Sequence, residues 1–225
     1  MFVVYKKRKL NLSIVDYGMG NTGSIKNAFK AIGVSARVAL SVDELYESDG
    51  IILPGVGAFG DAMRNIRKFD LFEPLNDLAL NIKKPILGIC LGQQIMAHGS
   101  EEDESVTGFG WIEGQVRRFD PTKVPSIPHV GWSDVTVTGR DEVLFHEAKP
   151  EDKYYFTHSF ALYCNPSSVG SLCQYGGEFV ASVRNENIFA TQFHPEKSQF
   201  AGSRILRNFA AFCSQKAIED QAHAQ

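Results

Sequence analysis

The chain has 225 residues, 44% of them hydrophobic and 22% charged, which is the composition of an ordinary globular protein of one large domain or two small ones. A formal net charge of −3 gives no electrostatic case for binding nucleic acid or an anionic membrane surface. No apolar run approaches the roughly 20 residues that cross a bilayer, so we expect no membrane partner.

The cysteines indicate a reducing compartment. There are four of them, without metal-ligand spacing and without the pattern of a disulfide framework: Cys90, Cys164, Cys173 and Cys213. We therefore expect a cytoplasmic protein with no metal and no cofactor, in which a reactive thiol can persist.

The first half of the chain alternates strand-like and helix-like segments. The expected elements are a strand over 10–16, a helix over 22–32 ended by Gly33, a strand over 34–40, a short helix over 43–46 capped by Ser41, a buried strand over 50–53, and a helical region over 61–81 interrupted near Asp70 and Pro74. This alternation predicts right-handed βαβ units and a parallel sheet. Sites in such sheets form at the carboxyl ends of the strands, where the 18–20 and 54–57 loops fall.

The second half is richer in strands. Acidic residues fill 101–104, and short strands separated by polar and proline breaks are expected at 115–119, 135–138, 154–160, 169–175, 179–183 and 188–193, before a helix at 202–213. We interpret these strands as antiparallel additions to the same sheet. The predicted organisation is an N-terminal extension (1–9), one domain (10–215) and a polar tail (216–225), with a three-layer, flavodoxin-like α/β fold and a mostly parallel sheet.

Cys90 lies where a buried strand meets a helix-like segment over 93–98. Gly88 and Gly92 flank it two residues away on each side, which removes side chains that would crowd a sharp turn. This strand–turn–helix pattern is typical of a nucleophile elbow, where the positive end of a helix favours the thiolate. A lone cysteine is more often a small buried core residue, so this interpretation requires a base.

The best candidate for the base is His194, in the segment Phe193–Ser198 after the last apolar strand. Residues two apart on an extended backbone point to the same side, so Glu196 can orient the ring while Pro195 stiffens the spacing. Alternatively, His194 is simply a histidine at a strand end. His158, at another strand end, is either a base or a wall of the same cleft, and the other histidines carry no specific argument.

Hydrolysis through a thiol also needs donors for an oxyanion. The backbone N–H of Leu91, the residue after the cysteine, is one candidate, and the glycine-flanked loop Gly55–Gly57 could supply another. A plain strand-to-helix turn is the alternative.

Together these segments carry a family resemblance. Gly88-Ile89-Cys90-Leu91-Gly92-Gln93-Gln94 with Phe193-His194-Pro195-Glu196 resembles the class I, triad-type glutamine amidotransferases. Three further motifs resemble the glutaminase subunits of imidazole glycerol phosphate synthase: Asp16-Tyr17-Gly18-Met19-Gly20-Asn21, Leu53-Pro54-Gly55-Val56-Gly57-Ala58-Phe59 and His194-Pro195-Glu196-Lys197-Ser198. The resemblance covers about 10–212 and implies the class I amidotransferase fold. It also implies that L-glutamine is hydrolysed to glutamate and ammonia.

The resemblance assigns roles to individual residues. It implies a catalytic triad of Cys90, His194 and Glu196; oxyanion donors at Leu91, Val56 and Gly57; a glutamine pocket formed by Gln94, Glu102, Gly55, Ser159 and Phe160; and a partner interface at Met19, Asn21 and Lys197. The partner implied is a (β/α)8-barrel cyclase that forms a heterodimer with this chain and uses the ammonia to make imidazole glycerol phosphate and AICAR in histidine biosynthesis.

Two positions depart from the family's usual pattern. Gln93 stands where methionine is usual, and Ser133 where asparagine is usual. Neither belongs to the triad, but both leave open a paralogous glutaminase that feeds ammonia to a sugar-modifying enzyme of surface-polysaccharide synthesis. More distant alternatives are a cysteine peptidase on this fold and a flavodoxin-like protein that binds FMN phosphate at the 18–24 loop.

Overall fold

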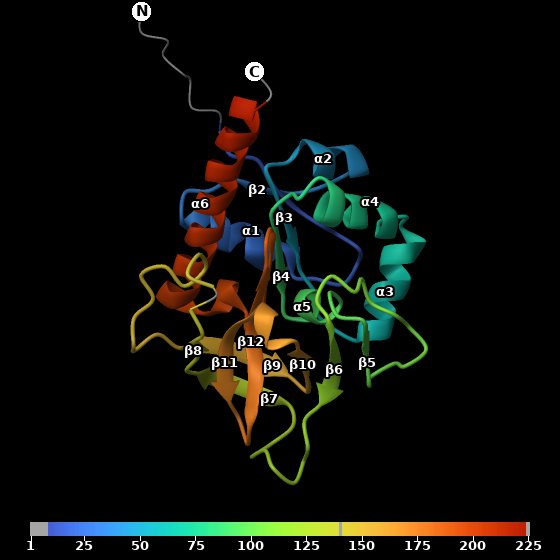
Figure 1. Ribbon diagram of the computed structural model, residues 1–225, viewed down its shortest axis with the longest axis vertical. Helices are drawn as coiled ribbons and strands as arrows, with labels where there is room; N and C mark the ends of the chain where they lie inside the picture. Colours follow the sequence, from blue (N-terminus) through green and yellow to red (C-terminus); the bar gives the residue numbers. More distant parts are fainter. Residues whose placement is uncertain (1–8, 140, 224–225) are drawn as a thin grey trace, which may run out of the picture.

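The structure, a computed structural model, describes residues 9–139 and 141–223. Its centre is an eight-stranded sheet in the order β2-β1-β3-β4-β13-β12-β11-β8 (Figure 1). Five strands are mutually parallel: β1 (Leu12–Ile14), β2 (Ala36–Val38), β3 (Gly50–Leu53), β4 (Ile86–Ile89) and β13 (Ile188–Thr191). Three antiparallel strands extend the sheet beyond β13: β12 (Glu178–Asn185), β11 (Val169–Gln174) and β8 (Thr136–Val137).

Helices cover both faces of this sheet. One face carries α1 (Thr22–Ala31) and α6 (Gln199–His223); the other carries α2 (Val42–Glu47), α3 (Phe59–Lys68), α4 (Phe72–Asn76) and the π-helical turn η1 (Asp77–Asn81). Strand side chains alternate between the two cores: on β3, Ile51 and Leu53 face α3, while Ile52 faces α1 and α6. The predicted three-layer α/β fold with a mostly parallel sheet is confirmed.

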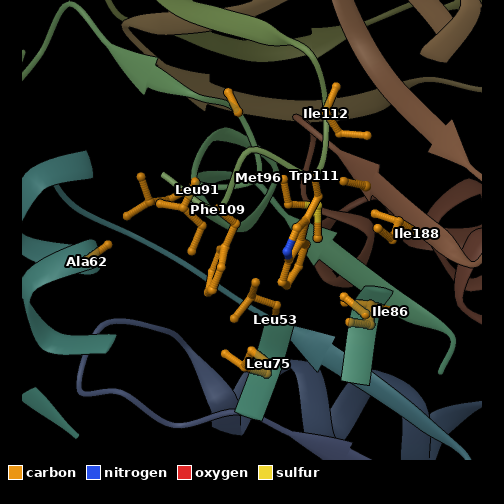
Figure 2. Packing of buried hydrophobic residues seen from close by; sticks show 14 of the residues in the cluster. Leu53, Ala62, Leu75, Ile86, Leu91, Met96, Phe109, Trp111, Ile112 and Ile188 are labelled. Carbon is orange, nitrogen blue, oxygen red and sulfur yellow. The ribbon is translucent and has the colours of Figure 1, made fainter. Parts of the chain in front are cut away.

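The core on the α3 side extends to the segment that follows the elbow. Phe109 and Trp111 stack with ring centroids 4.2 Å apart and lie over Leu53, Ile86 and Ile188 at the sheet surface (Figure 2). Burying each such side chain stabilises the fold by about 1.5–3 kcal/mol. This packing anchors the segment that follows the acidic residues 101–104, where the Phe109 N–H also donates to the Ile95 carbonyl oxygen at 2.8 Å.

Contrary to the prediction, only part of the strand-rich half joins the large sheet. A three-stranded sheet contains β5 (Gly99–Ser100), β6 (Gly114–Arg118) and β10 (Phe160–Cys164), and a two-stranded sheet contains β7 (His129–Ser133) and β9 (Tyr154–His158). The predicted strand over 154–160 is split at Ser159, because the chain leaves its pairing with β7 there and pairs with β6 instead. Strand β7 was not predicted, since Gly131 interrupts its pattern at φ 143°.

Several boundaries also differ from the predictions. The helix expected to end at residue 213 continues to His223, through most of the expected polar tail, with Lys216 and Asp220 paired at 2.9 Å. Asp70, at φ 55°, breaks the 61–81 region as predicted, but Pro74 lies in the first turn of α4, where its missing N–H costs nothing. Most of the expected N-terminal extension, and residues 224–225, lie outside the described residues. None of the described helices is long and apolar enough to cross a membrane.

Candidate active site

Cys90 occupies a sharp turn between β4 and α5 (Leu91–Gln94). Its backbone has φ 56° and ψ −107°, a conformation that a residue with a side chain rarely adopts and that costs about 1–3 kcal/mol. A Cβ on Gly88 would lie 2.8 Å from the Gly92 carbonyl oxygen, and a Cβ on Gly92 would collide with the Leu53 carbonyl oxygen. Both glycines are therefore required by close backbone contacts, and the elbow geometry is present.

The helix after Cys90 is shorter than the sequence suggested. Helix α5 has four residues, and turns follow it to His98. The N–H groups of Gln93 and Gln94 bond to the Cys90 carbonyl oxygen at 2.9 and 3.3 Å. Leu91 is the first residue of this helix, where backbone N–H groups have no intrahelical acceptor. A single turn gives little macrodipole, so the stabilisation of a thiolate depends mainly on neighbouring side chains.

His194 and Glu196 form a buried pair. His194 Nδ1 lies 2.8 Å from Glu196 Oε1, and the two side chains are 3% and 2% exposed. The residues face one another across a 3₁₀ turn, η3 (Pro195–Lys197), rather than along an extended strand as predicted. Ser198 fixes this turn: its hydroxyl donates to the His194 carbonyl oxygen at 2.6 Å and accepts the Tyr155 N–H at 2.9 Å.

The charge environment makes His194 a base. Burial alone lowers the pKa of the imidazole, but Cys90 and then Glu196 outweigh burial and raise it well above its ordinary value. Because the carboxylate accepts the Nδ1 proton, the lone pair of the neutral ring is on Nε2. This nitrogen is buried and has no hydrogen-bond partner among the residues that the structure describes.

Cys90 and His194 line one pocket of about 330 Å³. Most of the other predicted site residues line it too: Leu91, Val56, Gly57, Gln94, Glu102, Ser159, Phe160 and Lys197. Glu196 lies behind His194. Gly55 does not line the pocket but packs beneath the elbow, where an added Cβ would lie 2.7 Å from Leu91 Cβ.

The loop from Gly55 to Gly57 has its central amide bonded to a neighbouring backbone carbonyl. The N–H of Val56 donates a 3.4 Å hydrogen bond to the Met19 carbonyl oxygen, although the Val56 residue is 44% exposed at the mouth of the pocket. Gly57 has φ 106°, which only glycine adopts easily. Asn21, also predicted at the interface, caps α1 by accepting the Ser24 N–H at 3.0 Å.

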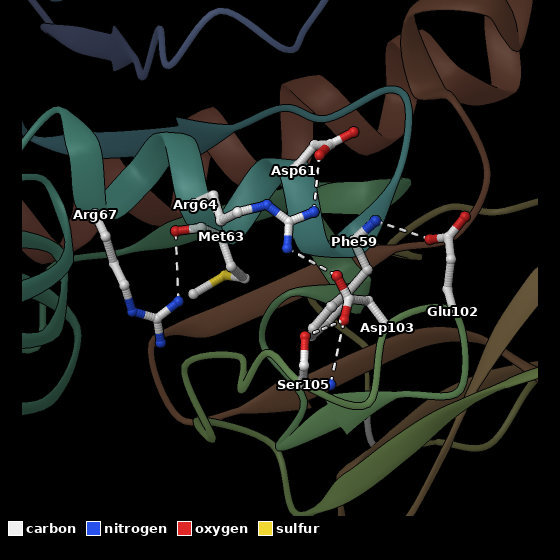
Figure 3. Close-up of polar contacts among 8 residues, drawn as sticks. All are labelled: Phe59, Asp61, Met63, Arg64, Arg67, Glu102, Asp103 and Ser105. Carbon is white, nitrogen blue, oxygen red and sulfur yellow. Dashed lines mark hydrogen bonds and ion pairs between the residues drawn. The ribbon is translucent and has the colours of Figure 1, made fainter.

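Glu102 connects the pocket to the N-terminus of α3. Its Oε2 accepts the Phe59 N–H at 2.8 Å, and so caps a helix whose own N-cap residue, Ala58, has no side-chain acceptor (Figure 3). The next residue, Asp103, accepts from Arg64 at 2.8 Å and lies against Gly60. The acidic segment is therefore bound to the helix that directly follows the 55–57 loop.

Sequence reasoning missed two groups at this site. Gln192, which is 0% exposed, donates from Nε2 to Cys90 Sγ at 3.6 Å. Its position two residues before His194 was an available signal, because such residues point to the same side of an extended segment. The second group is His129, buried beside His158 with 3.2 Å between Nδ1 and Nε2.

His158 is a wall of the pocket rather than a base. Its Nδ1 lies 2.8 Å from the Phe160 carbonyl oxygen, and its Nε2 faces His129, so both ring nitrogens are engaged. Burial lowers the pKa of His158 to about 3 and that of His129 to about 4, which keeps both rings neutral. Among the described residues, no group of three His, Cys, Asp or Glu side chains could hold a metal ion.

Comparison with known proteins decides the family. A model of the family "Glutamine amidotransferase class-I" matches residues 13–212. A Campylobacter jejuni protein called imidazole glycerol phosphate synthase subunit HisH 1 is 41% identical, over 88% of this chain and 98% of its own length. This chain belongs to the HisH family of class I glutamine amidotransferases. A Rhodopirellula baltica HisH subunit is 42% identical, over 88% of this chain and 96% of its own length.

Solved structures agree on the HisH fold. A putative GMP synthase subunit from Thermoplasma acidophilum gives a TM-score of 0.72 at 21% identity, covering 95% of this chain and 98% of its own. PurLQS from Thermotoga maritima gives 0.70 at 21% identity, covering 91% and 99%. At this identity the likeness shows the fold alone. The family resemblance seen in the sequence is confirmed, and the flavodoxin-like FMN interpretation is wrong.

Proposed function

We propose that the chain is the glutaminase subunit of imidazole glycerol phosphate synthase and acts through Cys90, His194 and Glu196. The observation that carries this proposal is the meeting of a strained thiol and a buried histidine in one pocket, with Glu196 on Nδ1 of the ring and no hydrogen bond to its Nε2 from the described residues. A thiol with a base oriented by a carboxylate is the arrangement of a cysteine hydrolase.

In the proposed reaction, Cys90 gives its proton to His194 Nε2, and the thiolate sulfur attacks the side-chain amide carbon of glutamine. The tetrahedral intermediate collapses as His194 gives that proton to the leaving nitrogen, so the C–N bond breaks and ammonia departs. Water, deprotonated by the same nitrogen, then attacks the thioester, and glutamate leaves as the sulfur recovers its proton. Glu196 stabilises the imidazolium in both halves of the reaction.

Glutamine recognition is proposed for Gln94, Glu102 and the Ser159–Phe160 backbone. Both hydrogens of the Gln94 amide are already donated, to the Phe160 carbonyl oxygen at 2.9 Å and to Gln192 Oε1 at 3.0 Å. Gln94 therefore offers its Oε1 to a donor on the substrate. The Glu102 carboxylate suits the substrate's α-ammonium group, since one of its oxygens is not used by the Phe59 N–H.

The oxyanion site is proposed to form from the Leu91 N–H and a second amide, that of Val56. The Val56 N–H must first leave the Met19 carbonyl oxygen, and the flanking glycines permit the peptide to turn. We propose that docking of a (β/α)8-barrel cyclase at Met19, Asn21 and Lys197 triggers this turn in a heterodimer. Lys197 is exposed, with Nζ 5.5 Å from the Tyr155 ring centroid. Ammonia then serves to make imidazole glycerol phosphate and AICAR.

The cytoplasm is the proposed compartment, since each of the four cysteines is a free thiol.

The test measures the rate of glutamate release in two samples. One contains the chain alone, and the other contains the chain with a histidine-pathway cyclase that carries its ligand. Cys90→Ala is expected to abolish release, by at least about 10³-fold, while cyclase binding persists. Cys164→Ala, which removes a thiol outside the pocket, is the control. Full activity in Cys90→Ala would exclude the triad.

The same assay separates the two acceptors left open by the sequence. Formation of the imidazole product from glutamine supports the histidine-pathway cyclase, with slow turnover by the chain alone. Glutamate release that no histidine-pathway cyclase accelerates would instead favour a sugar-modifying partner.

A further inference from the structure

Gln192 is a buried amide in contact with the proposed nucleophile. It lies directly after β13, two residues before His194, and is 0% exposed. Its Nε2 is 3.6 Å from Cys90 Sγ, and its Oε1 is 3.0 Å from Gln94 Nε2. The steps proposed above for the triad do not use this side chain.

One backbone carbonyl fixes which end of the Gln192 amide faces the sulfur. The Phe160 oxygen can only accept, so the Gln94 atom 2.9 Å from it must be the nitrogen. That nitrogen also donates to Gln192, so the Gln192 atom facing it must be the oxygen. The Gln192 nitrogen is therefore directed at Cys90. His158 Nδ1, 2.8 Å from the same carbonyl oxygen, helps to hold it in place.

His194 and Tyr17 also lie near the thiol, but neither serves as a neutral hydrogen-bond donor to the sulfur. His194 receives the thiol proton and becomes the counter-ion, with Glu196 behind it. Tyr17 also feels the charge of Cys90, but its hydroxyl donates to the Pro54 carbonyl oxygen at 2.7 Å, and burial raises its pKa, so it stays neutral. A hydrogen bond strengthens when its acceptor becomes charged, so a fixed N–H at the sulfur favours thiolate over thiol.

We propose that Gln192 is a further catalytic residue, whose amide N–H donates to Cys90 Sγ and stabilises the thiolate. This inference rests on the proposed role of Cys90 as nucleophile and adds the group that prepares the sulfur before substrate arrives. Gln94 and the Phe160 carbonyl are its positioning elements.

The test measures Cys90 reactivity without glutamine. In Gln192→Glu the side chain keeps its shape and can still accept from Gln94, but it presents an oxygen to the sulfur. In Gln192→Met the donor is replaced by an apolar group of similar length. The rate of alkylation of Cys90 by iodoacetamide is followed by mass spectrometry across pH 5–10, with Cys90→Ala as the background.

In both variants, Cys90 is expected to be alkylated at least about tenfold more slowly at neutral pH. The pH midpoint of the alkylation rate is expected to move upward. Gln93→Met is the matched control and should keep the wild-type profile, because this neighbouring buried glutamine makes no side-chain hydrogen bond to the sulfur or to any other described residue. Burial raises the pKa of Cys164 to about 11 and of Cys173 to about 12, so neither thiol competes.

Wild-type alkylation profiles in both variants would overturn the proposal. A measurement on the unmodified protein covers the case in which neither variant folds. The NMR chemical shift of the Gln192 side-chain amide protons should change as Cys90 is deprotonated. A chemical shift that stays constant over the pH titration would also overturn the proposal. Retained glutaminase activity in Cys90→Ala would instead remove the nucleophile, so the two failures are distinguishable.

Discussion

The two walls of the pocket differ in how firmly their groups are held. On one wall, Cys90 and His194 are buried, as is Gln192 next to the sulfur: the sulfur is bonded to the Gln192 amide, that amide to Gln94, and the imidazole to Glu196. On the other wall, the exposed Val56 residue belongs to a loop whose amide donates to the Met19 carbonyl oxygen.

In the proposed mechanism, this difference separates the groups that are in place in the chain alone from the group that the partner completes. The groups proposed to move protons are held by hydrogen bonds, which preorganises the proposed nucleophile. The amide proposed as the second oxyanion donor is bonded to the Met19 carbonyl oxygen, and a loop bordered by glycines can turn it with little strain. On this proposal, the chain hydrolyses glutamine only slowly until the partner turns the Val56 amide.

Glu102 lines the pocket and caps the helix that follows the Val56 loop, and a change there should have a larger effect than changes at Gln93 or Ser133. Glu102→Gln keeps an oxygen to cap α3 at the Phe59 N–H but removes the charge proposed to bind the substrate's α-ammonium. We expect the KM for glutamine to rise about tenfold or more, because a charged hydrogen bond contributes about 1.5–3 kcal/mol, while the melting temperature changes little. Steady-state glutaminase kinetics and thermal unfolding together measure both.

Glu104→Gln is the control for that experiment, since Glu104 is an exposed carboxylate two residues further along the same segment. An unchanged KM in Glu102→Gln would show that the carboxylate serves only to cap α3. A lowered melting temperature with a raised KM would show that the cap needs the charge as well.

One buried glutamine of the elbow segment lacks side-chain hydrogen bonds to the described residues. Gln93 is 0% exposed, and neither its Nε2 nor its Oε1 has a hydrogen-bond partner within the described residues. Burying an unpaired amide costs about 1–3 kcal/mol. Gln93→Met should therefore raise the free energy of unfolding by about 1–2 kcal/mol, measured by urea unfolding, with unchanged kcat.

Gln94→Met is the matched control, because the neighbouring glutamine has both of its amide hydrogens bonded. It should lower the free energy of unfolding and impair glutamine binding. Equal loss of stability in both variants would mean that the Gln93 amide is satisfied in solution.

Local patterns made part of this site predictable from the sequence. The turn at Cys90 is fixed by glycines two residues away, and Glu196 reaches His194 within one turn, so neighbouring residues contain the information. The roles of these residues remain proposals, but their meeting in one pocket is what the motifs predicted.

The features that were not predicted depend mostly on tertiary contacts between residues far apart in the sequence. Gln192 reaches Cys90 across 102 positions of sequence, and His129 reaches His158 across 29, so no local period marks either pair. Strand β7, which carries His129, exists through its pairing with β9. The C-terminal helix is longer than predicted: beyond its buried face it is supported by one i,i+4 ion pair, Lys216–Asp220, and one i,i+4 hydrogen bond, Gln215–Glu219.

Ser133, the second departure from the family pattern, lies at the far end of the histidine pair. Its hydroxyl is 2.9 Å from His129 Nε2. Because His158 must donate from Nδ1 to the Phe160 carbonyl oxygen, its Nε2 accepts from His129 Nδ1, and His129 Nε2 must then accept from the serine. The Phe160 carbonyl oxygen thus fixes the tautomer of both rings, and the serine hydroxyl donates the last hydrogen bond of this series.

Removing this hydroxyl should have the smallest effect of the three. In Ser133→Ala, His129 Nε2 loses its hydrogen-bond donor, so the histidine pair that contacts the Phe160 carbonyl oxygen is held less firmly. We expect the KM for glutamine to rise about two- to fivefold with kcat unchanged, since a neutral hydrogen bond contributes about 0.5–1.5 kcal/mol. Ser133→Asn keeps a donor and should restore the KM, and Thr136→Ala removes an exposed hydroxyl on β8 as the control. If Ser133→Ala left both the KM and the ¹⁵N-detected histidine tautomers unchanged, Ser133 would play no part in holding the His129–His158 pair.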